Sequence, residues 1–547
     1  MQNCDGLKNK FQALGINMQD KHSLQNLEYV KILPVLCELY EQDKLALDTI
    51  YLDLNINKER FLRDFATFKG FEFQALKEYD PYFLSKLSLK QMKEYQCLVF
   101  QEDENFIYFA FAKIPSNELL DKLQASFKHK FIKIFLANPS KIENFIEKYS
   151  LECEINDLIA ELKIELTHSD KKDKSAVAKL FELICLQAIK LKASDIHFEP
   201  SSEEALIRFR IDGLLGVFLR VELEIYHALI LYVKLLAHLN MAETRKAQDG
   251  SFMMEFEGLE YDFRLSSLPL LYAESLVLRI LERKQKFLSL ENLEFEAKNL
   301  QLFRQSIQLP FGMILVTGPT GSGKSTTLYA AMSEIQNENK KIISVEDPVE
   351  YRLSLVQQIL LNPKAGLDFN NALRAILRQD PDVIMIGEMR DEQSLDIAVK
   401  SALTGHLVFS TLHTNDAVSA ISRMLDMKAK SYLLASALTL IIAQRLVRKL
   451  CKHCKEKINI EFEGVKEEFF EARGCEYCRQ SGFAGREVVA EFLFVDTHLA
   501  EMIRENKSKN ELLAYAKKQG FKTMFELGLA KVRLGITSLQ ELLRVLR

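Results

Sequence analysis

Hydrophobic and polar residues alternate with different periods along this chain, and the changes of period divide it into segments. Within residues 57–150, alternation at Cys97–Phe100 and Phe106–Phe111 predicts strands. Helical spacing of apolar residues follows at Ser116–Phe127 and Lys141–Tyr149. We therefore predict a small α/β domain, and because it contains no catalytic constellation, we interpret it as a docking module.

The hydrophobic pattern of residues 176–285 predicts a second domain. Helical periodicity at Val177–Leu191 precedes an alternating run, Ala205–Ile211, and the Asp-Gly pair after that run indicates a hairpin. Alternation puts Arg208 and Arg210 on one strand face and apolar residues on the other. These two arginines either only solvate the sheet or serve a ligand, and the spacing does not decide between the two.

More arginines lie on the strands predicted next. A second hairpin is predicted at Ser251–Leu265, with Arg264 near its end. The apolar run Leu276–Leu281 predicts a buried strand that carries Arg279. Several strand arginines thus precede a segment with the pattern of a nucleotide-binding domain.

The stretch 313–335 combines an apolar run, a glycine-rich loop and a helix pattern. Met313–Thr317 predicts a strand, Leu328–Ile335 predicts a helix, and the loop GPTGSGKST between them meets the pattern G-x-x-x-x-G-K-[ST]. An ordinary strand–helix turn rich in glycine is the alternative, but both flanks fit a P-loop. The predicted phosphate-binding residues are Gly318, Pro319, Thr320, Gly321, Ser322, Gly323, Lys324, Ser325 and Thr326.

Each residue type of this loop has a mechanical role. Glycines let consecutive backbone N–H groups close around phosphate oxygens, and the following helix directs its positive N-terminal end at the same anion. Lys324 supplies a charge at the β- and γ-phosphates, and Ser325 offers its hydroxyl to Mg²⁺. Thr326 helps to close the start of the helix.

Two further apolar runs end in carboxylates. Ile342–Val345 predicts a strand that leads into Glu346 and Glu350, which are placed to hold a water or a metal. A nucleophilic water needs such a group. The run from Asp380 ends in Glu388, which we interpret as a Walker B acid whose longer side chain reaches Mg²⁺ through water.

Basic residues lie around these acids in the sequence. Arg374 and Arg378 are spaced i, i+4, which predicts one face of a helix. His413 ends another predicted strand, Leu407–Thr414, where a lone histidine is more often a hydrogen-bonded core residue than a catalyst. The carboxyl ends of strands are nevertheless where an open α/β sheet binds its ligand.

Four of the nine cysteines cluster after a predicted helix, Tyr432–Leu446. Cys451 and Cys454 form one C-x₂-C pair, and Cys475 and Cys478 form a second. This spacing predicts a structural tetrathiolate zinc site. A redox dithiol and two unconnected pairs are the alternatives. Four protein ligands fill the tetrahedron of Zn²⁺, so no coordination position is left for catalysis.

Composition narrows the function. A chain of 547 residues predicts several domains. Its net charge of −4 and its pI near 6.3 argue against bulk affinity for nucleic acid and leave open only a local basic patch. The first ten residues lack the apolar region of a signal peptide, and the longest apolar stretch, near Tyr432–Ala443, is too short to span a bilayer. We therefore expect a cytoplasmic protein.

Taken together, these motifs resemble those of the secretion ATPases of type II secretion systems and type IV pilus assembly. The resemblance runs from about Val177 to the C-terminus and extends more weakly over residues 57–150, which look like the docking domain of that family. The motifs that carry it are GPTGSGKST, VEDPVE (345–350), LRQDPDVIMIGEMRD (377–391), STLHTND (410–416), the two cysteine pairs, SDIHFEP (194–200), QDG (248–250) and GFKTM (520–524).

The resemblance implies an α/β fold, with a RecA-like P-loop ATPase domain preceded by a PAS-like α/β domain and a small α/β N-terminal docking domain. The expected boundaries are 1–56 for a helical N-terminal extension without an assigned role, 57–150 for the docking domain, 151–175 for a linker that is charged and turn-rich from His168 to Ser175, 176–285 for the PAS-like domain, 286–446 for the RecA-like domain, 447–498 for the zinc-binding segment and 499–547 for a C-terminal helical segment.

The resemblance also implies cofactors and partners. ATP, Mg²⁺ and Zn²⁺ are the expected cofactors. A homo-hexamer is expected at the cytoplasmic face of the inner membrane, where it acts on a polytopic platform protein and does not bind nucleic acid directly. An adaptor of the secretion or pilus machine is expected to dock on residues 57–150.

Family roles carry over onto the matching acids and the loop. Lys324 and Ser325 are expected to hold the phosphates and Mg²⁺, and Glu350 is expected to be the base that activates water. Glu388 is the expected Walker B acid. Glu346 belongs to the same acidic box as Glu350.

The histidine and four arginines complete the expected site. His413 would sense or orient the γ-phosphate. Arg208, Arg210, Arg374 and Arg378 are candidates for stabilising its charge, in part across a subunit boundary. The sequence does not decide which of the four touches the nucleotide.

Three other classes of protein compete with this interpretation. Retraction ATPases of the same family look shorter and lack both the docking domain and the cysteine pairs. A DNA-translocating motor is disfavoured because the chain has no basic surface interleaved with aromatic residues. A non-hydrolysing scaffold is disfavoured because Lys324, Glu350 and Glu388 are intact. Protein export, pilus assembly and DNA uptake are not separated by the sequence.

Overall fold

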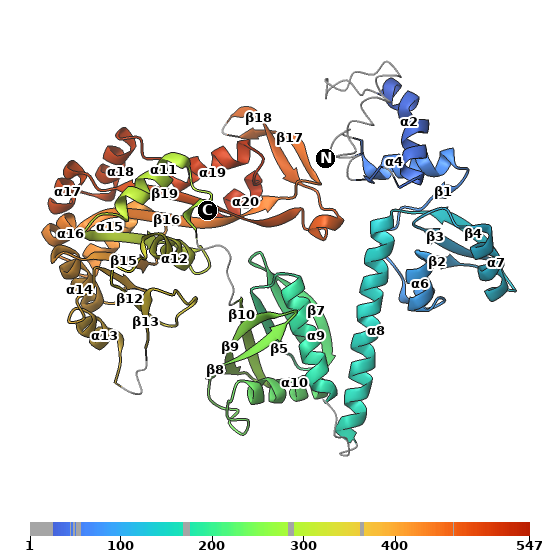
Figure 1. Cartoon of the computed structure of the whole chain (residues 1–547), viewed down its shortest axis with the longest axis horizontal. Coiled ribbons are helices and arrows are strands. Elements are labelled where there is room, and N and C mark those ends of the chain that lie inside the picture. The colour runs from blue at the N-terminus through green and yellow to red at the C-terminus, as the bar shows by residue number, and fades with distance from the viewer. Residues whose placement is uncertain are drawn as a thin grey trace. The chain divides into compact units, whose positions relative to one another are not determined.

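The computed structural model describes residues 26–43, 45–47, 50, 56–167, 175–282, 289–361, 366–462 and 464–546 (Figure 1). The chain divides into two compact units, Met1–Leu180 (unit 1) and Phe181–Arg547 (unit 2). No helix among the described residues is long and apolar enough to cross a membrane.

Unit 1 is built on a four-stranded sheet in the order β1-β4-β3-β2. Strands β1, β4 and β3 are parallel to one another, and β2 is antiparallel to β3. Ile107 and Phe109, two residues apart on β3, are buried, as period-2 alternation predicts. The elements are α2 (Asn26–Glu41), α4 (Lys58–Phe68), β1 (Glu72–Phe73), α5 (Pro81–Leu84), α6 (Leu89–Tyr95), β2 (Cys97–Glu102), β3 (Phe106–Phe111), α7 (Asn117–Ser126), β4 (Phe131–Leu136) and α8 (Pro139–Thr167).

Helix α2 belongs to the core of unit 1. Its Tyr29 and Leu36 are buried in the same hydrophobic cluster as Phe109 of the sheet. The described part of the expected N-terminal extension therefore shares a core with the expected docking domain. The helical prediction for residues 1–25 lies outside the described residues.

The expected linker, 151–175, is helical over its first part. Helix α8 continues past residue 150 to Thr167, because residues 140–167 contain no proline and no glycine. The expected boundary at residue 150 therefore does not coincide with a break in secondary structure. The charged stretch 168–174 lies outside the described residues.

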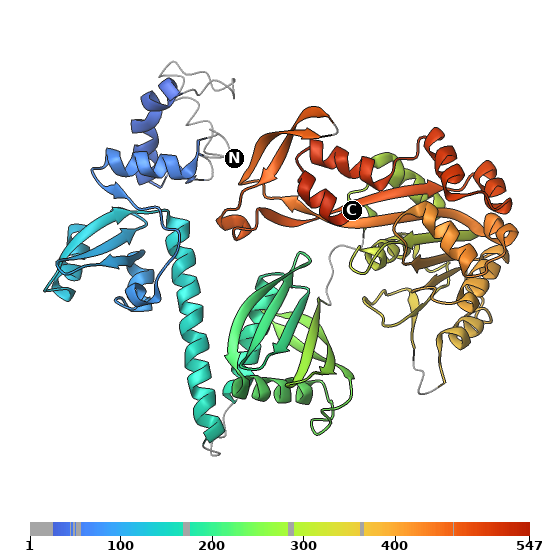
Figure 2. The same cartoon turned by 180° about the vertical axis from the view of Figure 1, so that it is seen from behind.

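Unit 2 contains a six-stranded antiparallel sheet in the order β7-β6-β5-β10-β9-β8, drawn in green in Figure 2. Both predicted hairpins are confirmed, because β6 pairs with β7 and β8 pairs with β9. Ile207 and Phe209 of β6 are buried, and Arg208 and Arg210 lie on the other face. The elements are α9 (Ala176–Lys190, which begins in unit 1), β5 (Asp195–Pro200), β6 (Glu204–Ile211), β7 (Leu214–Glu222), α10 (Leu223–Leu236), β8 (Gln248–Phe256), β9 (Leu259–Pro269) and β10 (Glu274–Glu282).

A seven-stranded sheet in the order β13-β12-β14-β15-β11-β16-β19 follows in unit 2. All its neighbouring strands are parallel except β19, which is antiparallel to β16. The elements are η1 (Leu290–Leu293), α11 (Ala297–Ser306), β11 (Gly312–Thr317), α12 (Lys324–Ile335), β12 (Ile342–Glu346), β13 (Val356–Leu360), α13 (Phe369–Ile376), β14 (Val383–Ile386), α14 (Glu392–Leu403), β15 (Leu407–Leu412), α15 (Ala417–Asp426), α16 (Ser431–Ala437), β16 (Leu438–Leu450), β17 (Lys455–Phe462), β18 (Val465–Ala472), η3 (Glu476–Cys478), β19 (Phe483–Phe494), α17 (Thr497–Arg504), α18 (Lys509–Lys518), α19 (Met524–Arg533) and α20 (Leu539–Leu546).

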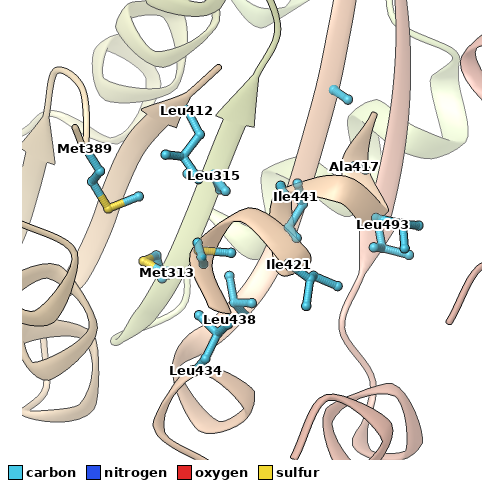
Figure 3. Packing of buried hydrophobic residues seen from close by; sticks show 14 of the residues in the cluster. Met313, Leu315, Met389, Leu412, Ala417, Ile421, Leu434, Leu438, Ile441 and Leu493 are labelled. Atoms are coloured by element: carbon cyan, nitrogen blue, oxygen red, sulfur yellow. The ribbon is translucent and has the colours of Figure 1, made fainter. Parts of the chain in front are cut away.

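Strand β11 is buried on both faces of this sheet. Met313 and Leu315 lie in one hydrophobic cluster, which also contains Ile441 of β16 (Figure 3). Ile314 and Val316 point to the other face and lie in a second cluster with residues of α12. Burial on both faces explains why this strand reads as a continuous apolar run without alternation.

The helix predicted at Tyr432–Leu446 is confirmed only as far as Ala437 and is wrong beyond it. Helix α16 ends at Ala437, and the strand β16 begins at Leu438. The sequence of this strand is apolar on both faces because β16 lies between β11 and β19 inside the covered sheet, so its pattern cannot be distinguished from that of a buried helix.

The C-terminal segment forms short helices, as predicted. Gly520 and Gly535 have φ angles of 88° and 65°, and they separate α18, α19 and α20. Glu541 of α20 is 1% exposed, and its carboxylate pairs with Arg448 of β16 and with Arg544, both at 2.7 Å. Burial favours the neutral acid, but Arg544 and Arg448 outweigh it and hold the pKa of Glu541 at about 2.

We predict that Glu541→Gln destabilises α20 by about 3 kcal/mol, because Arg448, whose side chain is 13% exposed, is left without its counter-charge. Since the folded pKa of Glu541 is below its unfolded value, its contribution is complete above about pH 4.5 and is lost as the pH falls toward 2. Native-state hydrogen exchange of α20 measures the difference. Arg544→Gln is the control, and it should cost under about 1 kcal/mol because that side chain is 48% exposed. An equal loss of stability in the two variants would contradict the role of Glu541 as the counter-charge of Arg448.

Candidate functional site

A cavity of about 620 Å³ opens where the carboxyl ends of β11, β12, β14 and β15 meet. We call it the main cavity. Parallel strands bring their carboxyl ends to one edge of the sheet, so motifs that are far apart in the sequence meet there. The predicted site residues that line it are Thr320, Gly321, Gly323, Lys324, Ser325, Thr326, Glu346, Glu350, Glu388 and His413.

The P-loop begins at Gly318, which has a φ angle of 150°. A Cβ atom at this position would lie 2.5 Å from the carbonyl oxygen of Gln444, so only glycine fits. The helix α12 starts at Lys324, as the strand–loop–helix pattern predicts. Backbone N–H groups at this helix start therefore border the cavity, where they favour an anion.

Lys324 is the cation at the base of the loop. Its Nζ donates to the carbonyl oxygens of Gly318 and Pro319 at 2.9 and 3.0 Å. Burial lowers the pKa of Lys324 below its ordinary value, whereas the charges of Glu388 and Glu350 oppose this shift. The ammonium group is therefore partly desolvated, and an anionic group in the cavity would interact with it more strongly than with a lysine in water.

Gln444 braces the P-loop, although sequence reasoning did not identify it. Its Nε2 donates to the carbonyl of Ser322 at 2.9 Å, and its Oε1 accepts from Thr327 Oγ1 at 3.0 Å. The side chain is buried on β16, so it connects the loop to the first turn of α12 and to the neighbouring strand. No local pattern in the sequence pointed to Gln444, because its segment was predicted to be a helix rather than a strand beside the P-loop.

The two acids of the acidic box have different surroundings. Glu346 is 3% exposed and accepts hydrogen bonds from Tyr329, from Ser344 at 2.5 Å and from Gln358 at 3.2 Å. Glu350 is exposed and lines the main cavity. The carboxylate of Glu346 is thus engaged by protein groups, whereas that of Glu350 faces the cavity.

Glu388 and His413 lie together, as expected for neighbouring strand ends. His413 Nε2 lies 3.3 Å from Glu388 Oε1, and Arg390 donates to the other carboxylate oxygen at 2.9 Å. Burial, followed by the charge of Lys324, lowers the pKa of His413 below its ordinary value of about 6.5. The imidazole is therefore neutral at pH 7 and can donate one hydrogen bond and accept another.

Backbone contacts fix the positions of these two side chains. Thr317, at the end of β11, accepts from the N–H of Thr414 at 3.0 Å, and the two hydroxyls are 2.6 Å apart. A Cβ atom on Gly387 would lie 3.1 Å from the carbonyl of Val345, so glycine lets the β14 end approach β12 closely. Glu388 and His413 thus lie just after the ends of β14 and β15, where these contacts tie the backbone to the neighbouring strands.

The four arginines expected to act on the phosphates are not among the residues that line the main cavity. Arg208 pairs with Glu199 at 2.8 Å, and Arg210 pairs with Asp195 at 3.8 Å. Arg374 lies on α13, but this helix ends at Ile376, so Arg378 lies beyond it and the prediction of one shared helix face is wrong.

Four other arginines line the cavity instead: Arg264 of β9, Arg279 of β10, Arg390 and Arg486 of β19. Arg264 and Arg279 are direct partners across the sheet, and Asp195 is the partner of both Arg279 and Arg210. Arg210, Asp195, Arg279 and Arg264 therefore form one cross-strand row. All three arginines of this row were identified in the sequence. The one selected as a candidate for the phosphates was Arg210, which is at the end of the row that does not line the cavity.

The four clustered cysteines bring their sulfurs together. All four Sγ atoms lie within 4.8 Å of one another, and the pairs Cys451–Cys475, Cys454–Cys478 and Cys475–Cys478 are each 3.7 Å apart. Four Zn–S bonds of about 2.3 Å in a tetrahedron require sulfurs about 3.8 Å apart. The donor set therefore fits a tetrathiolate zinc ion. It lies between the end of β16 and the start of β19.

Comparison with known families finds two regions of the chain that match family models. The family "Type II/IV secretion system protein" matches residues 170–544, and the MshEN domain matches residues 71–152. The first match covers more than half of the chain and contains every residue that lines the main cavity.

Several characterised proteins are similar to the chain over most of its length. Type II secretion system protein E of Xanthomonas campestris is 42% identical over 387 residues, which are 69% of this chain and 68% of that protein. Type II secretion system ATPase E of Vibrio cholerae is 39% identical over 438 residues, covering 78% and 87%. Type IV pilus assembly ATPase PilB of Acinetobacter baylyi is 34% identical over 495 residues, covering 85% of each.

Among solved structures, the Legionella pneumophila ATPase DotB has the same fold, with a TM-score of 0.51 at 21% identity, covering 66% of this chain and 94% of that one. The family match, the three relatives and the P-loop cavity agree. The chain belongs to the type II/IV secretion system protein family, and it is an ATPase.

Proposed function

We propose that this ATPase is a hexameric motor that powers assembly of a type II secretion pseudopilus or a type IV pilus from the cytoplasmic face of the inner membrane. One observation carries the proposal: the P-loop, Glu350, Glu388 and strand arginines border a single cavity. This arrangement supports phosphoryl transfer to water with cations around the phosphates. The names of the relatives support the choice of machine, and a DNA-uptake pseudopilus would use the same motor.

The residues of the main cavity divide the work of hydrolysis. Lys324 and the loop N–H groups bind the phosphates, and Ser325 and Glu388 would hold Mg²⁺. Mg²⁺ would neutralise charge on the β- and γ-phosphates. Glu350 orients and deprotonates the attacking water, and its exposure to the cavity supports this role over Glu346. The neutral His413 hydrogen-bonds to the γ-phosphate.

The remaining parts connect the ATPase to its machine. Residues 57–150 bind a cytoplasmic or membrane adaptor, and the ring acts on a polytopic platform protein of the inner membrane. The zinc ion held by the four cysteines has a structural role, because four thiolates leave no open position. Direct binding of nucleic acid is not part of this proposal, because the net charge of −4 argues against bulk affinity for it.

We predict that Glu350→Gln stops ATP turnover and keeps ATP binding, because it removes the base and leaves the P-loop intact. Lys324→Ala should lose both ATP turnover and ATP binding. Glu388→Ala should weaken only the Mg²⁺-dependent part of ATP binding. Phosphate release and equilibrium binding of a fluorescent ATP analogue, each with and without Mg²⁺, separate the three effects.

Wild-type turnover of Lys324→Ala would contradict the P-loop assignment. Normal turnover of Glu350→Gln together with an inactive Glu346→Gln would move the base to Glu346. Glu334→Gln is a matched control, because Glu334 pairs with Arg304 outside the cavity.

A second prediction concerns the cations around the phosphates. Arg264→Ala and Arg279→Ala should each lower turnover by about 10³-fold, since γ-phosphate charge in the transition state needs a nearby guanidinium. ATP binding should change much less. Steady-state phosphate release checks the effect, and Arg220→Ala, on the outer strand of the same sheet, should behave as wild type.

Arg208, Arg210, Arg374 and Arg378 remain proposed donors across a subunit boundary. Mixing Lys324→Ala subunits with Arg208→Ala/Arg210→Ala subunits tests this, because donation in trans should restore the activity that random assembly predicts for intact interfaces. Turnover that stays at the baseline at every mixing ratio, in rings shown to be mixed, would exclude donation in trans by these two arginines.

The third prediction is one zinc ion per chain. Metal analysis of the purified protein should find it, and Cys475→Ser should lose it and increase hydrogen exchange around β17 and β18. Cys185→Ser is the matched control, because that cysteine is buried elsewhere in unit 2 and should leave the zinc content unchanged. Wild-type protein without zinc would rule the site out.

A further inference from the structure

The carboxylate of Glu350 faces the main cavity without a hydrogen-bond or ion-pair partner among the described residues. Its position therefore depends on how the backbone of the acidic box is held. The peptide group that joins Val349 to Glu350 is held at both of its polar atoms. Arg264 Nη2 donates to its carbonyl oxygen, and its N–H donates to the phenol oxygen of Tyr329 at 3.2 Å.

Tyr329 connects this peptide to the P-loop. It lies on α12, which begins at Lys324, and its side chain is fully buried. Its phenol oxygen also accepts from the N–H of Tyr351 at 3.4 Å, and the two rings pack edge to face with centroids 5.3 Å apart. The helix that carries the phosphate-binding lysine thus also holds the backbone that carries Glu350.

The phenol of Tyr329 acts as donor and acceptor at once. Its hydrogen is donated to Glu346, which is fixed in turn by Ser344 and Gln358. Burial, followed by the charge of Glu346, raises the pKa of Tyr329 well above its ordinary value, so the phenol remains protonated at physiological pH. The lone pairs of its oxygen are then free to accept the two backbone N–H groups.

We propose that Tyr329 is a positioning residue for ATP hydrolysis, which holds the Val349–Glu350 peptide, and through it the Glu350 carboxylate, at a fixed place relative to Lys324. The inference rests on the proposed role of Glu350 as the base. A misplacement of about 1 Å in a reacting group can cost on the order of 10²-fold in rate. Glu346 contributes to this positioning because it accepts the hydrogen bond from the Tyr329 hydroxyl and so fixes the orientation of the phenol.

The first test is Tyr329→Phe, which keeps the buried ring and removes only the oxygen. The expected result is a fall in kcat of about 10- to 100-fold, with the dissociation constant for ATP within about threefold of wild type. Lys324 and the loop keep their own contacts in this variant. A merely structural defect would instead weaken binding and lower the melting temperature together.

The second test is a double-mutant cycle. If Tyr329 acts through Glu350, adding Tyr329→Phe to Glu350→Gln should cause no further loss of turnover, whereas independent roles would multiply. Single-turnover hydrolysis of radiolabelled ATP is sensitive enough to follow the slow Glu350→Gln background.

Tyr226→Phe is the matched control. Tyr226 is also fully buried in unit 2, and its hydroxyl donates to the carbonyls of Phe198 and Glu274 at 3.2 and 2.6 Å. It should lower the melting temperature and leave kcat within about twofold of wild type, since it lies outside the main cavity.

Two results would overturn the proposal: a kcat of Tyr329→Phe within twofold of wild type, or an equal loss on the wild-type and Glu350→Gln backgrounds. Full activity of Glu350→Gln would instead show that the proposed base is wrong. If Tyr329→Phe does not fold, Glu346→Gln puts the same question, because it weakens the anchor of the phenol. That variant should lower kcat without weakening ATP binding and without further loss on Glu350→Gln, and unchanged kcat would overturn the proposal.

Discussion

Burial of β11 on both faces is the constraint on which the seven-stranded sheet and its phosphate-binding loop depend. Its alternate residues enter two separate hydrophobic clusters, so the strand cannot shift by one residue without exchanging them. The loop after it is therefore fixed in register, and Gly318 turns against the carbonyl of Gln444 at a distance that excludes any side chain. The shape of the phosphate-binding loop is thus a consequence of packing in the sheet.

The same sheet explains why Lys324 keeps its charge although acids lie close to it. Parallel strands bring Glu350, Glu388 and His413 to one edge. Within the described part of the chain, Glu388 pairs with His413 and Arg390, whereas the hydrogen bonds of Lys324 go to carbonyls of its own loop. The lysine therefore keeps a desolvated charge directed at the cavity. Preorganised charge of this kind stabilises a phosphate group without any reorganisation at the moment of reaction.

Much of this site could be predicted from the sequence, because strand–loop–helix patterns and terminal carboxylates are local signals. The P-loop, both acidic strand ends and the cysteine pairs were found in this way. Residues that reach the site only through tertiary contacts were not predicted. Gln444 was hidden in a doubly buried strand that reads as a helix, and Arg264 reaches the cavity only because its sheet lies beside it. The choice between Arg210 and Arg264 required the cross-strand register, which no spacing within one strand reveals.

We propose that ATP is hydrolysed in the main cavity by water activated at Glu350. The most direct measurement is an experimental structure of the Glu350→Gln protein with ATP and Mg²⁺, in which hydrolysis is blocked. We expect the triphosphate in the 318–326 loop, the γ-phosphate between Lys324 and the arginines of β9 and β10, and an ordered water between that phosphate and the side chain at position 350. A γ-phosphate directed away from position 350, with Glu346 as the nearer acid, would contradict this proposal.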